Sequence, residues 1–294
     1  MNRPDQVWVF DGSGYVREKI PAEGLLRLLY HHPIGGAPLL FLARRKAVSR
    51  LYGTYCKTAY SAKKIPQFIN DYRIDMTGCT GDYANFAQFF SREKSGVRFP
   101  AGSNVLGAPC EGMAFAYRDI DPEKLIAAKG SFFTLAELFG SRKLAENYRG
   151  GSMVAIRLNP TNYHRMHFFD DGHSRGSKLI DGDLLSVNPL AVRNIARLYC
   201  QNKRVLTLFS SKNFGQAAIV EVGATFIGSI VHLFTRGDRV RRGEQASYFL
   251  PGGSLVLFFF EAGKFSPAAT LLEQTAAGYE TIVQIGQPIG NGQL

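Results

Sequence analysis

Six successive apolar residues, Leu255–Phe260, follow directly after the segment Pro251–Ser254. A short apolar run bounded by glycine and proline is typical of a strand that is buried on both faces. The run therefore predicts a β-rich core with this strand inside it. It also places Ser254 at the mouth of the buried strand.

The two glycines before Ser254 suit a chain that cuts itself. Glycine lets the backbone adopt conformations forbidden to other residues, and it leaves its carbonyl open to attack. The Ser254 hydroxyl can take up the acyl group of Gly253 if a nearby base removes its proton. A plain turn before a strand has the same glycine-glycine-serine string, so this prediction depends on what the rest of the chain supplies.

The formal net charge of +11 calls for an anionic partner, either nucleic acid or an anionic membrane surface. Between Gly24 and Asn70 the chain has no Asp or Glu, and leucines and tyrosines alternate with basic residues. The basic residues are Arg27, Arg44, Arg45, Lys46, Arg50, Lys57, Lys63 and Lys64. Binding flat on an anionic bilayer requires such a basic, amphipathic helical stretch, although a solvated basic face gives the same pattern. We expect no nucleic-acid partner, because no recognised binding module occurs.

The sequence also indicates the compartment. No run of about 18 apolar residues occurs, so no transmembrane helix is expected. Met1–Asp5 does not lead into an apolar signal core, which argues against secretion. The four cysteines form no C-x-x-C pair, which favours a reducing cytosol and argues against structural zinc. We expect a peripheral membrane protein on the cytoplasmic face, and the sequence leaves open whether it forms a homo-oligomer.

The fold class that we expect is α+β, a β-rich core with a helical N-terminal membrane-facing region. Residues 1–75 should form the helical region and residues 76–294 the catalytic core. The strand candidates are Met153–Leu158, Arg165–Phe169, Val205–Phe209, Ala217–Val222, Phe226–Phe234 and Leu255–Phe260. The helix candidates inside the core are Leu135–Leu144 and Pro189–Tyr199.

Two histidines, His164 and His167, lie three residues apart just after a strand candidate and a proline. Histidine is the side chain best suited to move protons near neutral pH. Positions three apart in an extended strand face opposite sides, so the two rings should have different roles unless the chain bends. A metal site with Asp170, Asp171 and His173 is an alternative, but the spacing is not a common zinc pattern. A purely structural role for both histidines also stays open.

Glu111 stands beside Gly112 in a candidate turn. Such a carboxylate could orient a histidine and stabilise its charged form, as the acid does in a serine-histidine-aspartate relay. On its own the segment also fits a surface turn.

Together these segments resemble the phosphatidylserine decarboxylases, in particular the type without a transmembrane anchor, over nearly the whole chain. The most specific matches are Pro160–His167 and Val222–Thr225, in that order along the chain. The other matching segments are Leu51–Cys56, Phe68–Asp71, Phe89–Arg92, Leu185–Pro189, Asn202–Arg204, Gly228–Ile230 and Gly252–Ser254.

The resemblance implies a zymogen that cleaves itself between Gly253 and Ser254, giving chains 1–253 and 254–294. Ser254 matches the family's nucleophile, His167 its base, and Glu111 the position of its aspartate. The resemblance further implies that Ser254 becomes a pyruvoyl group, a bound form of pyruvate. This cofactor would form a Schiff base with the amine of phosphatidylserine and accept the electrons released with carbon dioxide. His164 would position the substrate or return a proton.

Three positions depart from the family pattern. Glu111 is one methylene longer than the family's aspartate, Asn162 stands where an aspartate is usual, and Leu255 replaces a threonine. These departures keep two alternatives in view: a pyruvoyl-dependent decarboxylase of a soluble amino acid or other amine, and an unprocessed membrane-binding pseudoenzyme. Because the nucleophile, the base and the preceding glycine are all present, we expect a working phosphatidylserine decarboxylase.

Overall fold

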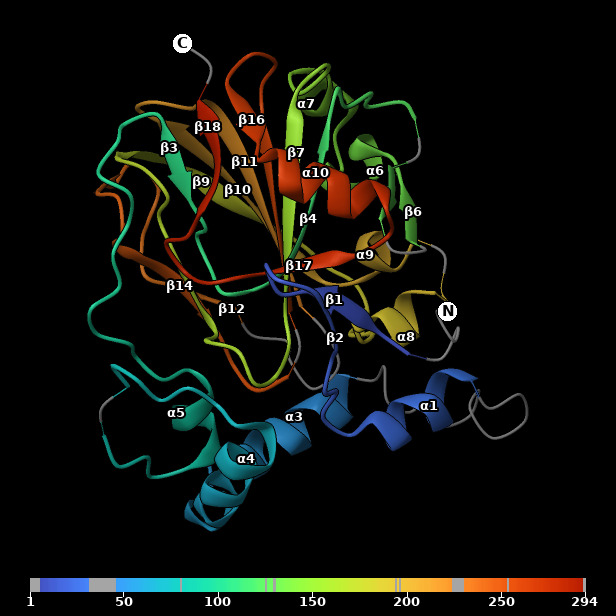
Figure 1. The fold of residues 1–294 in the computed structure, drawn as a ribbon, viewed down its shortest axis with the longest axis vertical. Coiled ribbons are helices and arrows are strands. Elements are labelled where there is room, and N and C mark those ends of the chain that lie inside the picture. The colour runs from blue at the N-terminus through green and yellow to red at the C-terminus, as the bar shows by residue number, and fades with distance from the viewer. Residues whose placement is uncertain are drawn as a thin grey trace.

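The structure is a computed structural model (Figure 1). It describes residues 6–31, 46–79, 81–124, 126–128, 131–193, 195, 197–223, 230–252 and 254–292. Gly253, Arg44, Arg45 and the Ala224–Thr225 part of a family motif lie outside the described residues.

A large sheet forms the centre of the fold, and within the described residues it has ten strands in the order β13-β9-β10-β11-β15-β7-β4-β17-β1-β2. Their bounds are β1 Trp8–Phe10, β2 Tyr15–Arg17, β4 Gly112–Arg118, β7 Ser152–Leu158, β9 Gly172–Ile180, β10 Arg204–Ser211, β11 Gly215–Val222, β13 Arg239–Val240, β15 Ser254–Phe260 and β17 Glu280–Val283. Neighbouring strands are antiparallel, except for the parallel pair β1–β17.

Strand β15 lies in the middle of this sheet, and every residue in it is buried. Side chains alternate between the two faces of a strand. Val256, Phe258 and Phe260 therefore belong to one hydrophobic cluster, whereas Leu255, Leu257 and Phe259 belong to the cluster on the opposite face. The expected β-rich core is confirmed, and by the same alternation Ser254 faces the side of Val256.

A small sheet, β12-β14-β8, packs on the face to which Ser254 points. Its strands are β8 Arg165–His167, β12 Ile230–His232 and β14 Gln245–Phe249. Met166, Ala246 and Phe249 from these strands join the same cluster as Val256. The packing brings the strand that carries His167 over the face of the sheet that carries Ser254.

Two further small sheets and a set of short helices complete the core (Figure 1). The sheet β16-β18-β3 consists of Phe265–Pro267, Pro288–Gly292 and Val105–Gly107, and the pair β5-β6 consists of Ile126–Ala128 and Ser131–Phe133. The helices are α6 Leu135–Phe139, α7 Arg142–Glu146, α8 Pro189–Val192, α9 Leu198–Gln201 and α10 Ala269–Ala276.

The helix expected over Leu135–Leu144 is divided in two. Gly140 ends α6 in the left-handed conformation, with φ 61°, and the Ser141 side chain caps the start of α7. A glycine C-cap followed at once by a serine N-cap stops one helix and starts the next. The segment Pro189–Tyr199 is likewise divided between α8 and α9.

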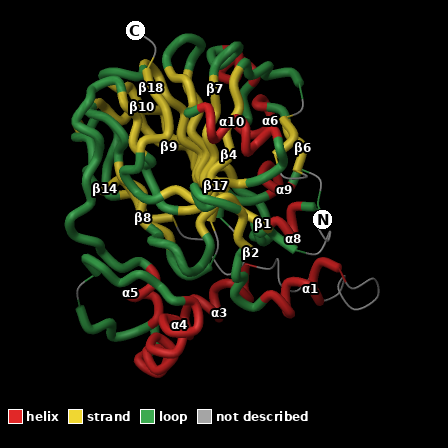
Figure 2. The backbone as a smooth tube through the Cα atoms, viewed as in Figure 1, coloured by secondary structure: helices red, strands yellow, loops and turns green. Residues whose placement is uncertain are grey.

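Helices between residues 23 and 90 form a separate layer below the sheets (Figure 2). They are α1 Glu23–His31, α3 Lys46–Cys56, the 3₁₀ helix η1 Ala59–Lys64, α4 Ile65–Tyr72 and α5 Phe86–Phe90. Cys56, Ile65, Phe86 and Phe89 give α3, α4 and α5 a small core of their own. Within the described part of the chain, no helix is long and apolar enough to cross a membrane.

The first residues of the described chain differ from the helical N-terminal region that we expected. Residues 8–17 form the β1–β2 hairpin, and β1 joins the edge of the large sheet beside β17. Val7 and Val9 are buried there against Met113. Val7 and Val9 are apolar residues two positions apart, as in a half-buried strand, and the turn residues Asp11–Ser13 follow them. This pattern was the sequence signal for the hairpin.

Candidate active site

Ser254 is the first residue of β15 and pairs with Leu158 of β7. Its side chain is fully buried, and Oγ has no hydrogen-bond partner among the described residues. A buried hydroxyl without a partner costs about 1–3 kcal/mol, so such an atom points to a function. Gly252, two residues before it, has φ 139°, a conformation that strongly favours glycine.

His164 lies in the turn between β7 and β8 and is completely buried. Its ring lies against that of Phe90, with 3.8 Å between ring centroids. Nδ1 is 2.9 Å from the Asn162 carbonyl oxygen, which can only accept, so Nδ1 carries the proton and Nε2 is left with a lone pair. Nε2 has no partner that meets full hydrogen-bond geometry.

The surroundings keep the His164 ring neutral. Burial lowers the pKa of His164 to about 3, and the positive charge of Arg92 acts in the same direction. The backbone carbonyls of Asn162 and Gly252 oppose this lowering of the pKa. The Gly252 carbonyl can raise the pKa of His164 only from close by. His164 therefore lies beside the chain segment that leads into Ser254.

His167 ends β8 and is also buried. Its Nδ1 is 2.8 Å from the Gly243 carbonyl oxygen, so Nδ1 donates and Nε2 accepts a hydrogen bond from the Tyr163 hydroxyl at 3.0 Å. Burial lowers the pKa of His167, the Gly243 carbonyl opposes this, and Arg165 lowers the pKa further. His167 is thus held as a neutral ring with a basic Nε2.

Glu111 does not contact the His167 ring directly, because Gly243 and Tyr163 occupy both ring nitrogens. Its Oε1 accepts from Asn162 Nδ2 at 3.0 Å and from the Tyr163 backbone N–H at 3.4 Å. Glu111 therefore acts on the segment that carries Tyr163, whose hydroxyl binds His167.

This geometry explains two of the three departures from the family pattern. The amide of Asn162 donates to Glu111, whereas an aspartate in its place would bring two carboxylates together. The Leu255 side chain lies in the cluster opposite to the face of Ser254, so it does not border the Ser254 hydroxyl.

The residues of the alternative metal site have other partners. Asp170 accepts hydrogen bonds from Ser211, from Asn213 and from Arg242. His173 pairs through its backbone with Ser210 and Arg239 in the large sheet. Within the described ranges, no group of three or more His, Cys, Asp or Glu side chains could hold a metal ion.

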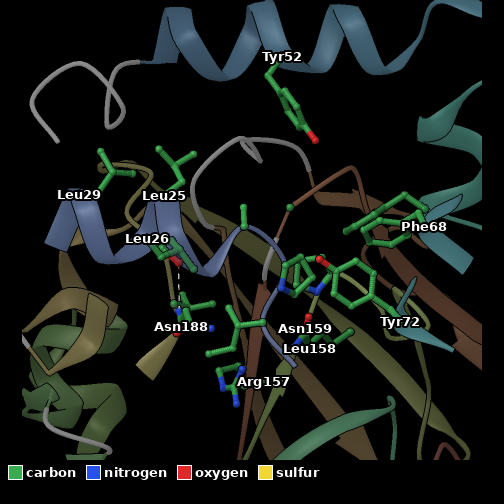
Figure 3. Close-up of a pocket in the computed structure, with 18 of the residues that line it drawn as sticks. Leu25, Leu26, Leu29, Tyr52, Phe68, Tyr72, Arg157, Leu158, Asn159 and Asn188 are labelled. Atoms are coloured by element: carbon green, nitrogen blue, oxygen red, sulfur yellow. Dashed lines mark hydrogen bonds between the residues drawn. The ribbon is translucent and has the colours of Figure 1, made fainter. Parts of the chain in front are cut away.

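A cavity of about 390 Å³ opens between the helical layer and the ends of β7 and β15 (Figure 3). Gly252 lines it, and so does Phe90, which packs on His164. Most of its other lining side chains are apolar and come from α1, α3 and α4: Leu25, Leu26, Leu29, Tyr52, Phe68 and Tyr72. Figure 3 shows the three leucines of α1 and Tyr52 of α3 on opposite walls.

Sequence reasoning singled out Ser254, His164, His167 and Glu111, but it assigned no role to Tyr163 or Arg92. Tyr163 belongs to the segment Pro160–His167 and Arg92 to the segment Phe89–Arg92, both of which carried the family resemblance. Membership in those segments was the sequence signal that could have identified them. Their roles depend on side-chain contacts between distant parts of the chain, such as Arg92 with Thr161, which no local pattern encodes.

Comparison with known proteins identifies the family of the chain. The sequence model described as phosphatidylserine decarboxylase matches residues 86–291. The chain is 39% identical over 281 residues to a protein of Clostridium novyi (strain NT), covering 94% of this chain and 95% of that one. It is 41% identical over 283 residues to a protein of Clostridium tetani (strain Massachusetts / E88), covering 95% of each. Both relatives are named phosphatidylserine decarboxylase proenzyme.

Proposed function

The chain belongs to the phosphatidylserine decarboxylase family, and we propose that it converts phosphatidylserine to phosphatidylethanolamine after cleaving itself between Gly253 and Ser254. One observation carries the proposal for this chain's own residues. The Ser254 hydroxyl is fully buried without a partner among the described residues, at the start of the central strand, and Gly252, two residues before it, lines an apolar cavity.

For self-cleavage, the Ser254 oxygen attacks the carbonyl carbon of Gly253, and the amide is exchanged for an ester. His167 takes the serine proton on Nε2, so the hydrogen bond from Tyr163 to that atom has to open first. Loss of the Cα proton of residue 254 then breaks the ester, leaves a carboxylate on Gly253, and forms a dehydroalanine. Hydrolysis of that residue releases ammonia and leaves the pyruvoyl group.

The site fits a pyruvoyl group at position 254. In this conversion Oγ leaves with the Gly253 carboxylate, Cβ becomes a methyl group, and the keto oxygen on Cα comes from water. Because Ser254 Oγ has no hydrogen-bond partner among the described residues, its departure breaks no hydrogen bond. The group supplies an electron-accepting carbonyl for decarboxylation. His164, neutral and close to the Gly252 carbonyl, would hold the substrate's ammonium group or move its proton.

The cavity accounts for a lipid substrate. Its apolar walls suit the acyl and glycerol portion of a phospholipid, and with Gly252 in the lining the serine headgroup would come close to residue 254. A free amino acid would leave most of these walls without a contact.

The exposed face of the helical layer supports binding to a membrane surface. Leu28 of α1 is 40% exposed and Leu51 of α3 is 72% exposed. Apolar side chains on helices beside an entrance for lipid can insert at the headgroup boundary, and nearby basic residues such as Arg50 and Lys57 attract anionic lipids. A phosphatidylserine molecule could then pass from the bilayer into the cavity.

Purified chain mixed with vesicles of phosphatidylserine and phosphatidylcholine tests this function. We expect release of carbon dioxide and accumulation of phosphatidylethanolamine, and no reaction with Ser254→Ala. Decarboxylation of free serine or another soluble amine but not of the vesicles would favour the soluble-substrate alternative. A chain that binds vesicles but stays uncut and inactive would favour the pseudoenzyme.

The assignment of the two histidines has a separate test. His167→Ala should stay a single chain, whereas His164→Ala should be cleaved and fail to decarboxylate. If His164→Ala stays uncut and His167→Ala is cleaved, the base for Ser254 is His164, which lies nearer to Gly252.

A further inference from the structure

Arg92 is a buried cation that the proposed mechanism does not use. It follows α5 and is 3% exposed. Its guanidinium donates to the carbonyl oxygens of Phe89, at 3.4 Å, and of Thr161 and Asn162, at 3.2 Å and 3.3 Å. Among the described residues it has no carboxylate partner, and its Nε has no hydrogen-bond partner. A buried charge without a counterion costs several kcal/mol, so its retention calls for a reason.

The contacts of Arg92 converge on His164. The Asn162 carbonyl oxygen accepts from Arg92 Nη2 and also from His164 Nδ1. Phe90, the last residue of α5, packs its ring on the imidazole, and Arg92 lies two residues further along the chain. One short segment thus fixes the position of the imidazole through Phe90 and the carbonyl that binds its Nδ1–H through Arg92.

The charge of Arg92 acts on the protonation of His164. A cation disfavours a second positive charge nearby, and Arg92 is the charged side chain that contributes to the low pKa of His164. No carboxylate of a neighbouring element offsets it. Phosphatidylserine brings a carboxylate and a phosphate, and these negative charges would favour a protonated imidazole. Arg92 opposes that change when the substrate is bound.

We propose that Arg92 is a positioning residue: it holds the Asn162 carbonyl oxygen against His164 Nδ1, which fixes the tautomer protonated on Nδ1, and its charge adds to the burial that keeps the imidazole neutral. The proposal rests on the proposed function only for the role of His164 in decarboxylation. The protonation state of His164 can be measured without any turnover.

Arg165 provides a matched control, because it is the arginine that lowers the pKa of the other histidine. It lies between the two histidines in sequence, yet its effect is on His167 and not on His164. Its Nε donates to the carbonyl oxygens of Ser91 and Arg92, and its Nη2 pairs with Glu93.

Nitrogen NMR of histidine-labelled Ser254→Ala protein, a uniform uncut chain, tests the proposal directly. We expect His164 to be protonated on Nδ1 at neutral pH. Adding Arg92→Gln should raise the pKa of His164 by about 1 and leave that of His167 in place. Arg92→Lys should keep the pKa of His164 low, and Arg165→Gln should shift the pKa of His167 alone.

Three results would overturn the proposal. The first is an Nε2-protonated His164 in the Ser254→Ala chain, a result that needs no Arg92 variant. The second is a His164 titration that Arg92→Gln does not move, and the third is an equal shift in Arg92→Lys. In the cleaved enzyme, the acidic limb of the kcat profile should move to higher pH in Arg92→Gln and not in Arg92→Lys. An inactive wild-type enzyme with the expected NMR result would count against the proposed function alone.

Discussion

At the scale of single residues, Ser254 Oγ and His164 Nε2 are buried polar atoms of the two proposed reacting side chains, and neither has a partner among the described residues. The residues around them are fully bonded, since His167, Tyr163, Asn162 and Glu111 form a continuous set of hydrogen bonds. The bonded residues can hold the geometry, while the two free atoms are available for the Gly253 carbonyl and the substrate. This division predicts different effects for substitutions in the two sets.

The charge of Glu111 can be tested without removing its hydrogen bonds. A glutamine side-chain oxygen can still accept from Asn162 and from the Tyr163 N–H, so Glu111→Gln removes mainly the negative charge. Because charged hydrogen bonds are stronger by about 1 kcal/mol, we expect self-cleavage to slow by roughly fivefold. Glu111→Asp should be tolerated. A time course on denaturing gels measures both, and cleavage of Glu111→Gln at the wild-type rate would remove this carboxylate from the mechanism.

The low pKa of His164 predicts a pH dependence of stability. The unfolded residue binds a proton below its ordinary pKa of 6.5, whereas the folded one does so only near 3. The contribution of His164 to the free energy of unfolding is therefore complete above pH 6.5. It decreases as the pH drops below that value, by about 1.4 kcal/mol per pH unit. In the Ser254→Ala chain, His164→Gln should reduce the slope of unfolding free energy between pH 6 and pH 4 by that amount. Equal slopes with and without His164 would show that its pKa is not lowered.

At the scale of the elements, a buried ion-pair network ties the N-terminal segment to the sheet. Arg157 of β7 binds both carboxylate oxygens of Glu18, at 3.0 and 2.8 Å, and those of Glu280 in β17, at 3.1 and 2.7 Å. All three side chains are at most 5% exposed. Arg157 also lines the cavity, so the network fixes the wall nearest to β15.

Loss of this arginine should destabilise the chain strongly, because two carboxylates would be left buried without a cation. We expect Arg157→Met to lower the unfolding free energy by about 3–5 kcal/mol. The control is Arg149→Met, whose pairs with Asp121 and Glu146 are exposed to solvent and should contribute little to stability. Chemical denaturation of the Ser254→Ala background compares the two, and equal losses would contradict the account.

The exposed leucines of the helical layer should carry part of the membrane affinity. Each buried leucine contributes about 1.5–3 kcal/mol, so Leu28→Gln with Leu51→Gln should weaken binding to anionic vesicles by at least about tenfold, in a way that salt does not mask. Leu179→Gln, on β9 and 57% exposed, is the control. Vesicle sedimentation measures the loss, and self-cleavage should continue in all variants. Unchanged binding of the double variant would place the membrane contact elsewhere.

At the scale of the whole molecule, residues 254–292 are built into the core at several places. Strand β15 pairs with β11 and β7, β17 pairs with β4 and β1, and β18 pairs with β3. A cut before Ser254 leaves all these pairings intact. The two chains should therefore stay together through gel filtration and separate only in denaturant, and a small chain lost under native conditions would contradict this.

The sequence was sufficient to predict the central strand, because Leu255–Phe260 can be stable only when buried on both faces. It also singled out Ser254 and the paired histidines. The partners of those histidines were not predictable, since Gly243 and Phe90 reach them from distant segments. The β1–β2 hairpin was missed because its strands are short and weakly patterned, and tertiary pairing with β17 stabilises it.

Intact mass measurement of the freshly purified protein tests the central claim most directly. The account predicts two chains, 1–253 and 254–294, with the second chain carrying a pyruvoyl group in place of Ser254 and resisting amino-terminal sequencing. Ser254→Ala should give one chain of full mass and no decarboxylation. A wild-type protein that remains a single unmodified chain and still decarboxylates phosphatidylserine would contradict the account.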